Sequence, residues 1–369
     1  MKILLIGEYS NLHCTLARAL KREGHEVVLI SNGDNWKNYS RDIDIRRRSH
    51  SIWGSFCYLW RIISLLPRMR GYDVVQLINP VFIDMKPRWN RWLFDYLQRN
   101  NRALSLGLFG DDYQVVKATS QSGLLAYTDF IVGNTPIVHH NNDERRREWI
   151  LSPKAELCQY ISQKADFLIS CLYEYHKAYD FPEFRSRLFY APLPIVPQKT
   201  IRHKDFFSPQ RKVKILIGIQ SKRAAMKGSD RMLPLFERLA QQYPDRIELT
   251  CVDSVPFEQY VKMVESTDIL VDQLYSYTPA MNALEAMSHG VIVVSGGEEE
   301  AYEFIEEKEL RPIINLRPMD DEANYRLLEQ IICSPERLQQ MSEQSRLFVL
   351  KHHEASQVAR RYLKIWQNN

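Results

Sequence analysis

The chain has 369 residues, of which 45% are hydrophobic and 25% are charged, a composition typical of a globular protein with more than one domain. Its six cysteines are scattered and form no C-x-x-C pair, which argues against a zinc site or a disulfide framework and favours a reducing compartment. No run of about eighteen apolar residues occurs. The opening MKILLIG has five apolar residues before Gly7, so we expect neither a membrane-spanning helix nor a secretory signal.

The net charge of +4 is unevenly distributed along the chain. Residues 1–199 contain 27 Lys and Arg against 20 Asp and Glu, a net charge of +7, and the remaining residues carry −3. Basic triplets stand at residues 46–48 and 145–147. A basic first half favours an anionic partner such as a membrane surface or a phosphorylated acceptor. We expect no nucleic-acid partner, and a solvated basic face remains an alternative explanation.

The first half begins with a buried strand that starts at residue 2 and ends in a turn at Gly7, followed by a helix with Leu16, Ala19 and Leu20 at helical spacing and a second strand at residues 26–33. This β–α–β start predicts a parallel sheet covered by helices. Further strands are predicted at residues 73–79, 102–110, 129–134 and 165–170. Residues 191–199 are rich in proline, which does not suit a central strand, and we interpret them as an inter-domain linker.

Residues 55–70 read SFCYLWRIISLLPRMR and mix aromatic, aliphatic and basic side chains. Such a mixture is typical of a segment that lies at a membrane interface. An ordinary amphipathic helix packed on the sheet is the alternative, and the sequence leaves both open.

The second half repeats the same alternation of strands and helices. Strands are predicted at residues 213–220, 247–252, 268–274, 291–297 and 312–316, with a helix at residues 229–244 after the first of them. The fold class is therefore α/β, with two doubly wound Rossmann-like domains at residues 1–198 and 199–352. Ligands of such domains bind outside the carboxyl ends of the strands, and we expect the site in the cleft between two facing domains.

Candidate ligand-binding residues follow the first strand of each half. A single glycine, Gly7, follows the first strand in place of a G-x-G-x-x-G fingerprint, and it either leaves room for a ligand or only turns the chain. Lys222, Arg223 and Lys227 follow the strand at residues 213–220. Arginine chelates two oxygens and lysine supplies a point charge, so this loop suits a diphosphate. A solvated loop is the alternative.

A second candidate region precedes the strand at residues 291–297. Thr278 is a suitable N-cap and Pro279 a suitable first helical residue. We expect the resulting helix terminus, with Ala280, Met281 and Asn282, to bind an anion.

Glu285 lies nearly two turns into this helix among small apolar residues. A carboxylate on the cleft edge of the helix can accept both hydroxyls of a ribose. The alternatives are a solvated glutamate and one paired with a neighbouring cation.

These segments together resemble a GT-B glycosyltransferase over essentially the whole length, and they are most similar to the retaining glycosyltransferase family 4. The resemblance rests on the opening KILLIGEYSNLH, the R…KGSD loop and LEAMSHGVIVVSGG. That family has an E-x7-E pattern whose second Glu binds the nucleotide ribose and whose first Glu contacts the donor sugar. Glu285 matches the second Glu, and Tyr277 stands at the position of the first.

The resemblance also implies roles for other residues. Arg223 and Lys227 would contact the diphosphate as catalytic residues, with Lys222 able to replace Arg223. The terminal helix at residues 353–369, with its stripe of Val358, Tyr362, Leu363 and Trp366, would cross back to the first domain. His13 is a candidate for the acceptor-side histidine of some members.

The expected function is transfer of a sugar from a UDP- or GDP-sugar to a glycan or lipid-linked acceptor, with retention, as in bacterial polysaccharide biosynthesis. We expect no cofactor and no metal, because no Asp-x-Asp motif is placed for the diphosphate and the nearest acidic pair is GDDY at residues 110–113. The expected location is the cytoplasm, at the inner face of the membrane. A GT-B-like sugar-nucleotide epimerase and a non-catalytic nucleotide-sugar-binding protein remain alternatives.

Overall fold

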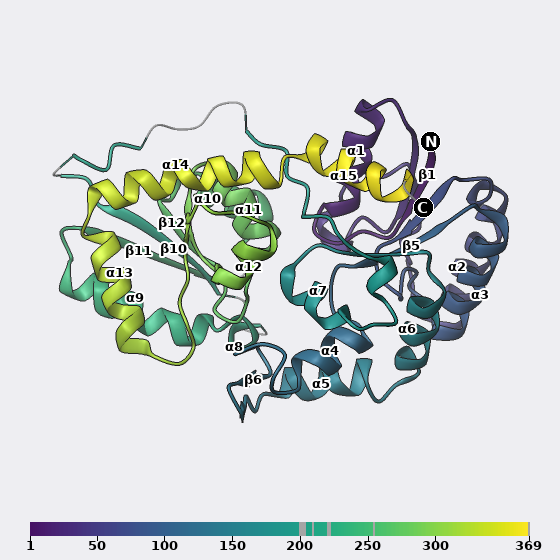
Figure 1. Cartoon of the computed structure of the whole chain (residues 1–369), viewed down its shortest axis with the longest axis horizontal. Coiled ribbons are helices and arrows are strands. Elements are labelled where there is room, and N and C mark those ends of the chain that lie inside the picture. The colour runs from purple at the N-terminus through teal and green to yellow at the C-terminus, as the bar shows by residue number, and fades with distance from the viewer. Residues whose placement is uncertain (199–203, 209, 220–222, 254, 368–369) are drawn as a thin grey trace. The chain divides into compact units, whose positions relative to one another are not determined.

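The computed structural model describes residues 1–198, 204–208, 210–219, 223–253 and 255–367 (Figure 1). The chain divides into two compact units. Unit 1 comprises Met1–Ala118, Glu144–Pro194 and Ala355–Asn369, and unit 2 comprises Thr119–Asp143 and Ile195–Glu354. The predicted domain division at residue 198 thus omits one feature, because residues 119–143 are part of unit 2 and the chain enters that unit twice.

Unit 1 is built on a seven-stranded parallel sheet with strand order β3-β2-β1-β4-β5-β8-β9. Its strands are β1 (Lys2–Ile6), β2 (Glu26–Ser31), β3 (Ile43–Asp44), β4 (Val74–Leu77), β5 (Leu104–Leu108), β8 (Phe167–Ser170) and β9 (Leu188–Tyr190). Residues 3–6 of β1 have no exposed surface, because helices cover both faces of a parallel sheet and select continuous apolar runs. The strand order reverses between β1 and β4, which is the switch point where such sheets bind ligands.

The first helix of unit 1, α1, follows β1, and the terminal helix α15 packs against α1 (Figure 1). Val358, Tyr362, Leu363 and Trp366 of α15 are all buried. The helices are α1 (Leu12–Arg22), α2 (Ile52–Leu65), α3 (Pro87–Asn100), α4 (Tyr113–Thr119), α5 (His140–Trp149), α6 (Pro153–Lys164), α7 (Tyr173–Tyr179) and α15 (Ala355–Gln367), with 3-10 turns η1 (Asn35–Lys37), η2 (Leu66–Met69) and η3 (Arg185–Arg187). The last residue of α4 and the first four residues of α5 belong to unit 2.

Unit 2 has a five-stranded parallel sheet with strand order β11-β10-β12-β13-β14. The strands are β10 (Val213–Ile219), β11 (Ile247–Asp253), β12 (Ile269–Val271), β13 (Ile292–Val294) and β14 (Ile313–Ile314). The helices are α8 (Ala224–Lys227), α9 (Ser229–Gln242), α10 (Phe257–Ser266), α11 (Met281–Ser288), α12 (Glu299–Phe304), α13 (Asp321–Ile332) and α14 (Pro335–His352).

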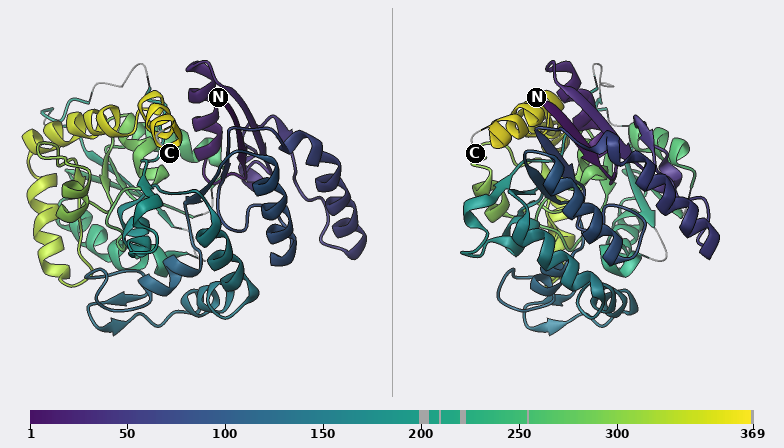
Figure 2. Two further views of the ribbon diagram at one scale, coloured as in Figure 1. Left: turned by 45° about the vertical axis from the view of Figure 1, so that its right-hand side comes forward. Right: turned by 90° about the vertical axis from the view of Figure 1, so that its right-hand side faces the viewer.

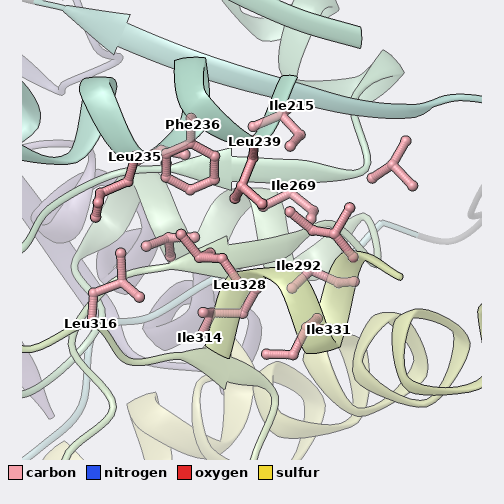
Figure 3. Close-up of a cluster of buried hydrophobic side chains, with 14 of the residues drawn as sticks. Ile215, Leu235, Phe236, Leu239, Ile269, Ile292, Ile314, Leu316, Leu328 and Ile331 are labelled. Carbon is pink, nitrogen blue, oxygen red and sulfur yellow. The ribbon is translucent and has the colours of Figure 1, made fainter. Parts of the chain in front are cut away.

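One face of this sheet forms the hydrophobic core shown in Figure 3. Ile215, Ile269 and Ile292 project from adjacent strands, and Phe236 of α9 and Leu328 of α13 pack against them. All five side chains are almost wholly buried, and full burial of such a side chain is worth about 1.5–3 kcal/mol. The core therefore fixes the sheet whose strand ends carry the candidate site.

The predicted strand at residues 129–134 is wrong as a member of the main sheet. Its only strand residues are β6 (Ile131–Val132), which pairs antiparallel with β7 (Thr135–Pro136). Gly133 and Asn134 form the two-residue turn of this hairpin, a connection typical of antiparallel strands. In the described part of the chain, no helix has the length and apolarity needed to cross a bilayer.

Candidate functional site

The candidate site lies at the carboxyl ends of β10 and β12 in unit 2. β11 lies on one side of β10, whereas β12, β13 and β14 follow on the other, so the strand order reverses between β10 and β12. At such a switch point the loops that leave the two strands diverge and open a crevice. The loop after β10 leads to α8, and the loop after β12 leads to α11.

Lys227 is held in place by a carboxylate that follows β12. Its Nζ lies 3.0 Å from Oδ1 of the buried Asp272, and Asn282 Nδ2 donates to the same oxygen at 2.9 Å. Gly228 ends α8 with φ of 71°, and a Cβ there would lie 2.6 Å from Cβ of Leu274. Only glycine allows the two loops to approach this closely, so Lys227 is brought to Asp272 by backbone geometry.

Arg223 is exposed at the start of α8. Its carbonyl oxygen accepts from the backbone N of Lys227 at 2.9 Å, so the two cations flank a single helical turn. Lys222, the third cation predicted for the diphosphate, lies outside the described residues.

Tyr260 of α10 is a site residue that the sequence did not indicate. Its ring lies against Gly218 near the end of β10, and its hydroxyl shares a hydrogen bond with the Asn282 side chain. Burial raises the pKa of Tyr260 to about 12, so the hydroxyl is neutral at physiological pH. Asp272 is a second candidate residue that the sequence did not indicate, since there it appears only as the polar end of an apolar strand.

The predicted start of α11 at Thr278 and Pro279 is wrong. The helix begins at Met281, and its N-cap is Ala280, which offers no capping side chain. Thr278 is buried two residues earlier. The helix does not reach back to Thr278, because the chain bends at Tyr277 and Thr278 and Tyr277 is anchored: its hydroxyl accepts from the backbone N of Ala126 at 2.8 Å, and its carbonyl accepts from the backbone N of Glu298 at 3.3 Å.

Glu285 consequently lies one turn into α11, about 6 Å from its first residue at 1.5 Å per residue. It stands three positions after Asn282, so both side chains lie on the same face of the helix. Glu285 is half-buried, and burial raises the pKa of its carboxyl to about 7. Within the described part of the chain this carboxylate has no hydrogen-bond or ion-pair partner, which disfavours the alternative of a structural pairing with a neighbouring cation.

Tyr277, at the position of the first Glu of the E-x7-E pattern, is packed against other side chains inside unit 2. It is buried, and its ring lies 4.9 Å from that of Tyr127. Tyr127 in turn donates to Oε1 of Glu298 at 2.8 Å, and Arg317 donates to both oxygens of Glu298 at 3.0 and 2.6 Å. Burial pushes the pKa of Glu298 upward, but the hydrogen bonds from Arg317 and its neighbours hold it below the usual value. This cluster fastens residues 119–143 to the rest of unit 2.

Gly7 and His13 belong to unit 1. Gly7 has φ of 90°, and a Cβ there would lie 2.1 Å from Cγ2 of Ile78, so the turn and the close approach of Ile78, just after β4, explain this glycine. The His13 ring is wholly buried, with Nδ1 2.8 Å from the carbonyl oxygen of Gly7, and Nε2 has no hydrogen-bond partner among the residues that the structure describes. Burial lowers the pKa of His13 to about 4, so the ring is neutral.

Glu8 caps the helix that follows. Its two carboxylate oxygens accept from the backbone N–H groups of His13 at 3.2 Å and Cys14 at 2.7 Å. Burial raises the pKa of Glu8 to about 8, although these hydrogen bonds oppose the shift. The start of α1 is therefore satisfied by a side chain of its own unit.

Comparison with solved structures identifies the architecture. No protein-family profile and no curated protein sequence matches the chain. Sucrose-phosphate synthase from Thermosynechococcus elongatus aligns with a TM-score of 0.61 at 13% identity, over 100% of this chain and 98% of that one. The fold is GT-B. WaaG, a glycosyltransferase involved in lipopolysaccharide biosynthesis, aligns with a TM-score of 0.55 at 13% identity over 100% of both chains.

A third GT-B structure carries ligands. HepE of Anabaena, solved in complex with UDP and glucose, aligns with a TM-score of 0.58 at 8% identity over 100% of both chains. The predicted fold class of two Rossmann-like domains is thus confirmed. At these identities the likeness concerns the fold, and assignment to glycosyltransferase family 4 stays a prediction.

Proposed function

We propose that the protein is a glycosyltransferase that binds a nucleoside-diphosphate sugar at the carboxyl ends of β10 and β12 in unit 2. The observation that carries the proposal is the half-buried Glu285 carboxylate, which has no partner in the described part of unit 2. A buried charge is costly unless something pairs with it. Two ribose hydroxyls supply the missing donors, and a bound UDP or GDP moiety carries both.

The groups around Glu285 fit the rest of the donor. The first N–H groups of α11 have no capping side chain, so they are available to a phosphate oxygen. Lys227, held by Asp272, and the exposed Arg223 supply positive charge from the neighbouring loop. GT-B proteins such as HepE have been solved with UDP-glucose, which supports the same class of donor here.

The proposed chemistry is displacement at the anomeric carbon of the sugar. As the bond between that carbon and the diphosphate oxygen breaks, negative charge grows on the diphosphate. Arg223 and Lys227 stabilise this charge, and because Asp272 already orients the ammonium of Lys227, little reorganisation is needed. The acceptor hydroxyl attacks the sugar carbon, and its proton passes to the departing phosphate or to solvent. We propose that the configuration is retained and that no divalent metal is required.

The acceptor is proposed to be a glycan or a lipid-linked glycan. WaaG acts in lipopolysaccharide biosynthesis, and one TarM structure contains UDP together with a glycerol-linked GlcNAc, which supports acceptors of this class. The net charge of +7 on residues 1–199 suits an anionic acceptor or a membrane that carries it. We place the protein in the cytoplasm, at the inner face of the membrane.

The test is a screen of UDP- and GDP-sugars by calorimetry, followed by a turnover assay with and without glycan acceptors. Glu285→Gln is expected to lose at least tenfold in donor affinity, whereas the exposed Glu303→Gln serves as a matched control and keeps wild-type affinity. Release of an altered sugar nucleotide without any acceptor would indicate an epimerase. Tight binding with no turnover on any acceptor would indicate a binding protein.

A further inference from the structure

Helix α2 of unit 1 exposes a continuous row of large hydrophobic side chains. Thirteen large hydrophobic side chains are exposed in the described part of the chain, and five of them lie on this one helix. Their exposed fractions are 93% for Ile52, 73% for Trp53, 57% for Phe56, 66% for Trp60 and 38% for Ile63. We call these five residues the α2 stripe. Clusters of this kind mark a surface that binds something else.

The α2 stripe is a feature of a well-formed helix. Ser51 caps the helix by accepting from the backbone N of Gly54 at 3.0 Å. On the opposite face Tyr58, Ile62 and Leu65 are buried and hold the helix on unit 1. α2 therefore combines both possibilities that the sequence left open, because one face packs as an ordinary amphipathic helix does and the other face stays apolar and exposed.

The α2 stripe is accessible from outside unit 1. Figure 2 shows α2 at the outer margin of this unit, with α3 on its inner side. The rings of Trp53 and Phe56 stack with centroids 5.6 Å apart and an interplanar angle of 22°, so the first turn of the helix carries a flat aromatic platform.

In the sequence next to the α2 stripe, all charged side chains are cationic. Residues 45–72 contain six arginines and no aspartate or glutamate. Arg48, Arg68 and Arg70 are exposed and Arg61 is half-buried.

One carboxylate approaches this region from the segment before α3. Asp84 lies 3.7 Å from Arg47 and 4.0 Å from His50, so it offsets charge at the start of α2. The α2 stripe remains flanked by cations at both ends, Arg48 before the helix and Arg68 and Arg70 after it.

We propose that the α2 stripe docks on the surface of an anionic lipid bilayer. Tryptophan and phenylalanine favour the boundary between headgroups and acyl chains, where the stripe would insert in the plane of the membrane. The flanking arginines would contact lipid phosphates, and each such cation adds to the attraction of an anionic surface. A second copy of the chain fits less well, because a two-fold contact would oppose arginine to arginine across the interface.

The inference concerns binding alone and does not depend on sugar transfer. The full-length protein is mixed with vesicles of phosphatidylcholine, with and without phosphatidylglycerol, in the absence of any nucleotide sugar. We expect sedimentation with the anionic vesicles, a blue shift of tryptophan fluorescence, and weaker binding as salt rises.

The decisive variant replaces Trp53, Phe56 and Trp60 with serine. These side chains are exposed, so the melting temperature is expected to stay at the wild-type value while the partition coefficient falls at least tenfold. Leu347→Ser and Met319→Ser, at exposed apolar positions of unit 2, are the matched controls and keep wild-type partitioning. A variant with Arg61, Arg68 and Arg70 replaced by glutamine should bind more weakly and respond less to salt.

Two results would overturn the proposal. One is wild-type partitioning of the triple serine variant, or no binding of the wild type to anionic vesicles at low salt. The other is a wild-type dimer that becomes monomeric in the triple serine variant, which would make the α2 stripe an interface between copies. Glu285→Gln should partition as the wild type does, so failure of the proposed sugar transfer and failure of membrane docking are distinguishable.

Discussion

Donor binding should depend on pH through Glu285. Its carboxyl has a pKa of about 7 in the free protein because the side chain is half-buried. Ribose hydroxyls donate to the ionised carboxylate, whereas the protonated form offers a donor of its own and accepts less well. If only the ionised form binds, about nine-tenths of the protein is competent at pH 8 and about one-tenth at pH 6. We therefore expect donor affinity to fall about tenfold between pH 8 and pH 6.

The raised pKa of Glu285 also makes the stability of the ligand-free protein depend on pH, in the direction opposite to donor affinity. The pKa of Glu285 is raised from 4.5 to about 7, so the folded state binds the proton more tightly than the unfolded state. The free energy of unfolding accordingly falls as pH rises from about 4.5 to about 7, and the loss persists above that. Glu285→Gln removes this cost at equal volume. After discounting for partial exposure, we expect the variant to be more stable than the wild type by about 1–3 kcal/mol at pH 8.

The assay is calorimetric titration with an intact sugar nucleotide, whose phosphates do not change charge between pH 6 and pH 8. The wild type, Glu285→Gln and the control Glu303→Gln are compared at pH 6, 7 and 8, each with a thermal melt. Glu285→Gln should bind weakly at every pH, and it should discriminate poorly between ribo- and 2′-deoxyribonucleotide donors. A wild-type affinity that is flat with pH, or a variant that melts lower and keeps its ribose preference, would refute the assignment.

Three further predictions concern the two cations of the α8 loop, the contact between Tyr127 and Glu298, and metal independence. Arg223→Ala and Lys227→Ala should each weaken donor binding by about 1.5–3 kcal/mol, or roughly tenfold or more. Unchanged affinity in a folded double variant would contradict this. Because Lys227→Ala also leaves the buried Asp272 carboxylate unpaired, its melting temperature is compared with that of Asp272→Asn to separate this effect from the loss of the lysine charge. Tyr127→Phe should lower stability by about 1–3 kcal/mol, since Glu298 loses a buried donor, while donor affinity measured by calorimetry stays unchanged. Turnover should survive EDTA, and activity that disappears with EDTA and returns with Mn²⁺ would reject metal independence.

Much of the fold follows from local sequence. The central strands are mostly apolar and are bounded by glycine or polar residues, because a parallel sheet is buried on both faces. The edge strands β3 and β9 were missed, since two or three residues at an edge leave no such run. The hairpin at residues 131–136 was mistaken for a main-sheet strand, because a short pair of apolar residues has the same local pattern in a hairpin as in a main-sheet strand. Strands of the main sheet are defined by pairing with residues far away along the chain, and the periodicity of a local segment does not report such pairing.

The candidate site was predictable to a different extent at each position. Glu285 stood out because a carboxylate between Leu284 and Ala286 conflicts with the apolar character of the helix. The structure gives it a raised pKa and, among the described residues, no partner. The N-cap at Thr278 was predicted from local preference alone. Tertiary contacts of Tyr277 overrode that preference by fixing this residue in a bend before the helix. Asp272 gave no signal, because its role depends on Lys227, which is 45 residues away along the chain.

Tyr277 and Glu285 show how one pattern can divide between folding and function. Both lie in the segment that links β12 to β13, eight residues apart. At the first position a tyrosine accepts from the backbone of Ala126 and packs against the ring of Tyr127, so it serves to attach residues 119–143 to the rest of unit 2. At the second position the carboxylate is desolvated and unpaired within the described residues, a state that costs stability in the absence of ligand. A residue that only supported the helix would be under pressure to lose that charge, so its cost is best explained by a ligand that pairs with it.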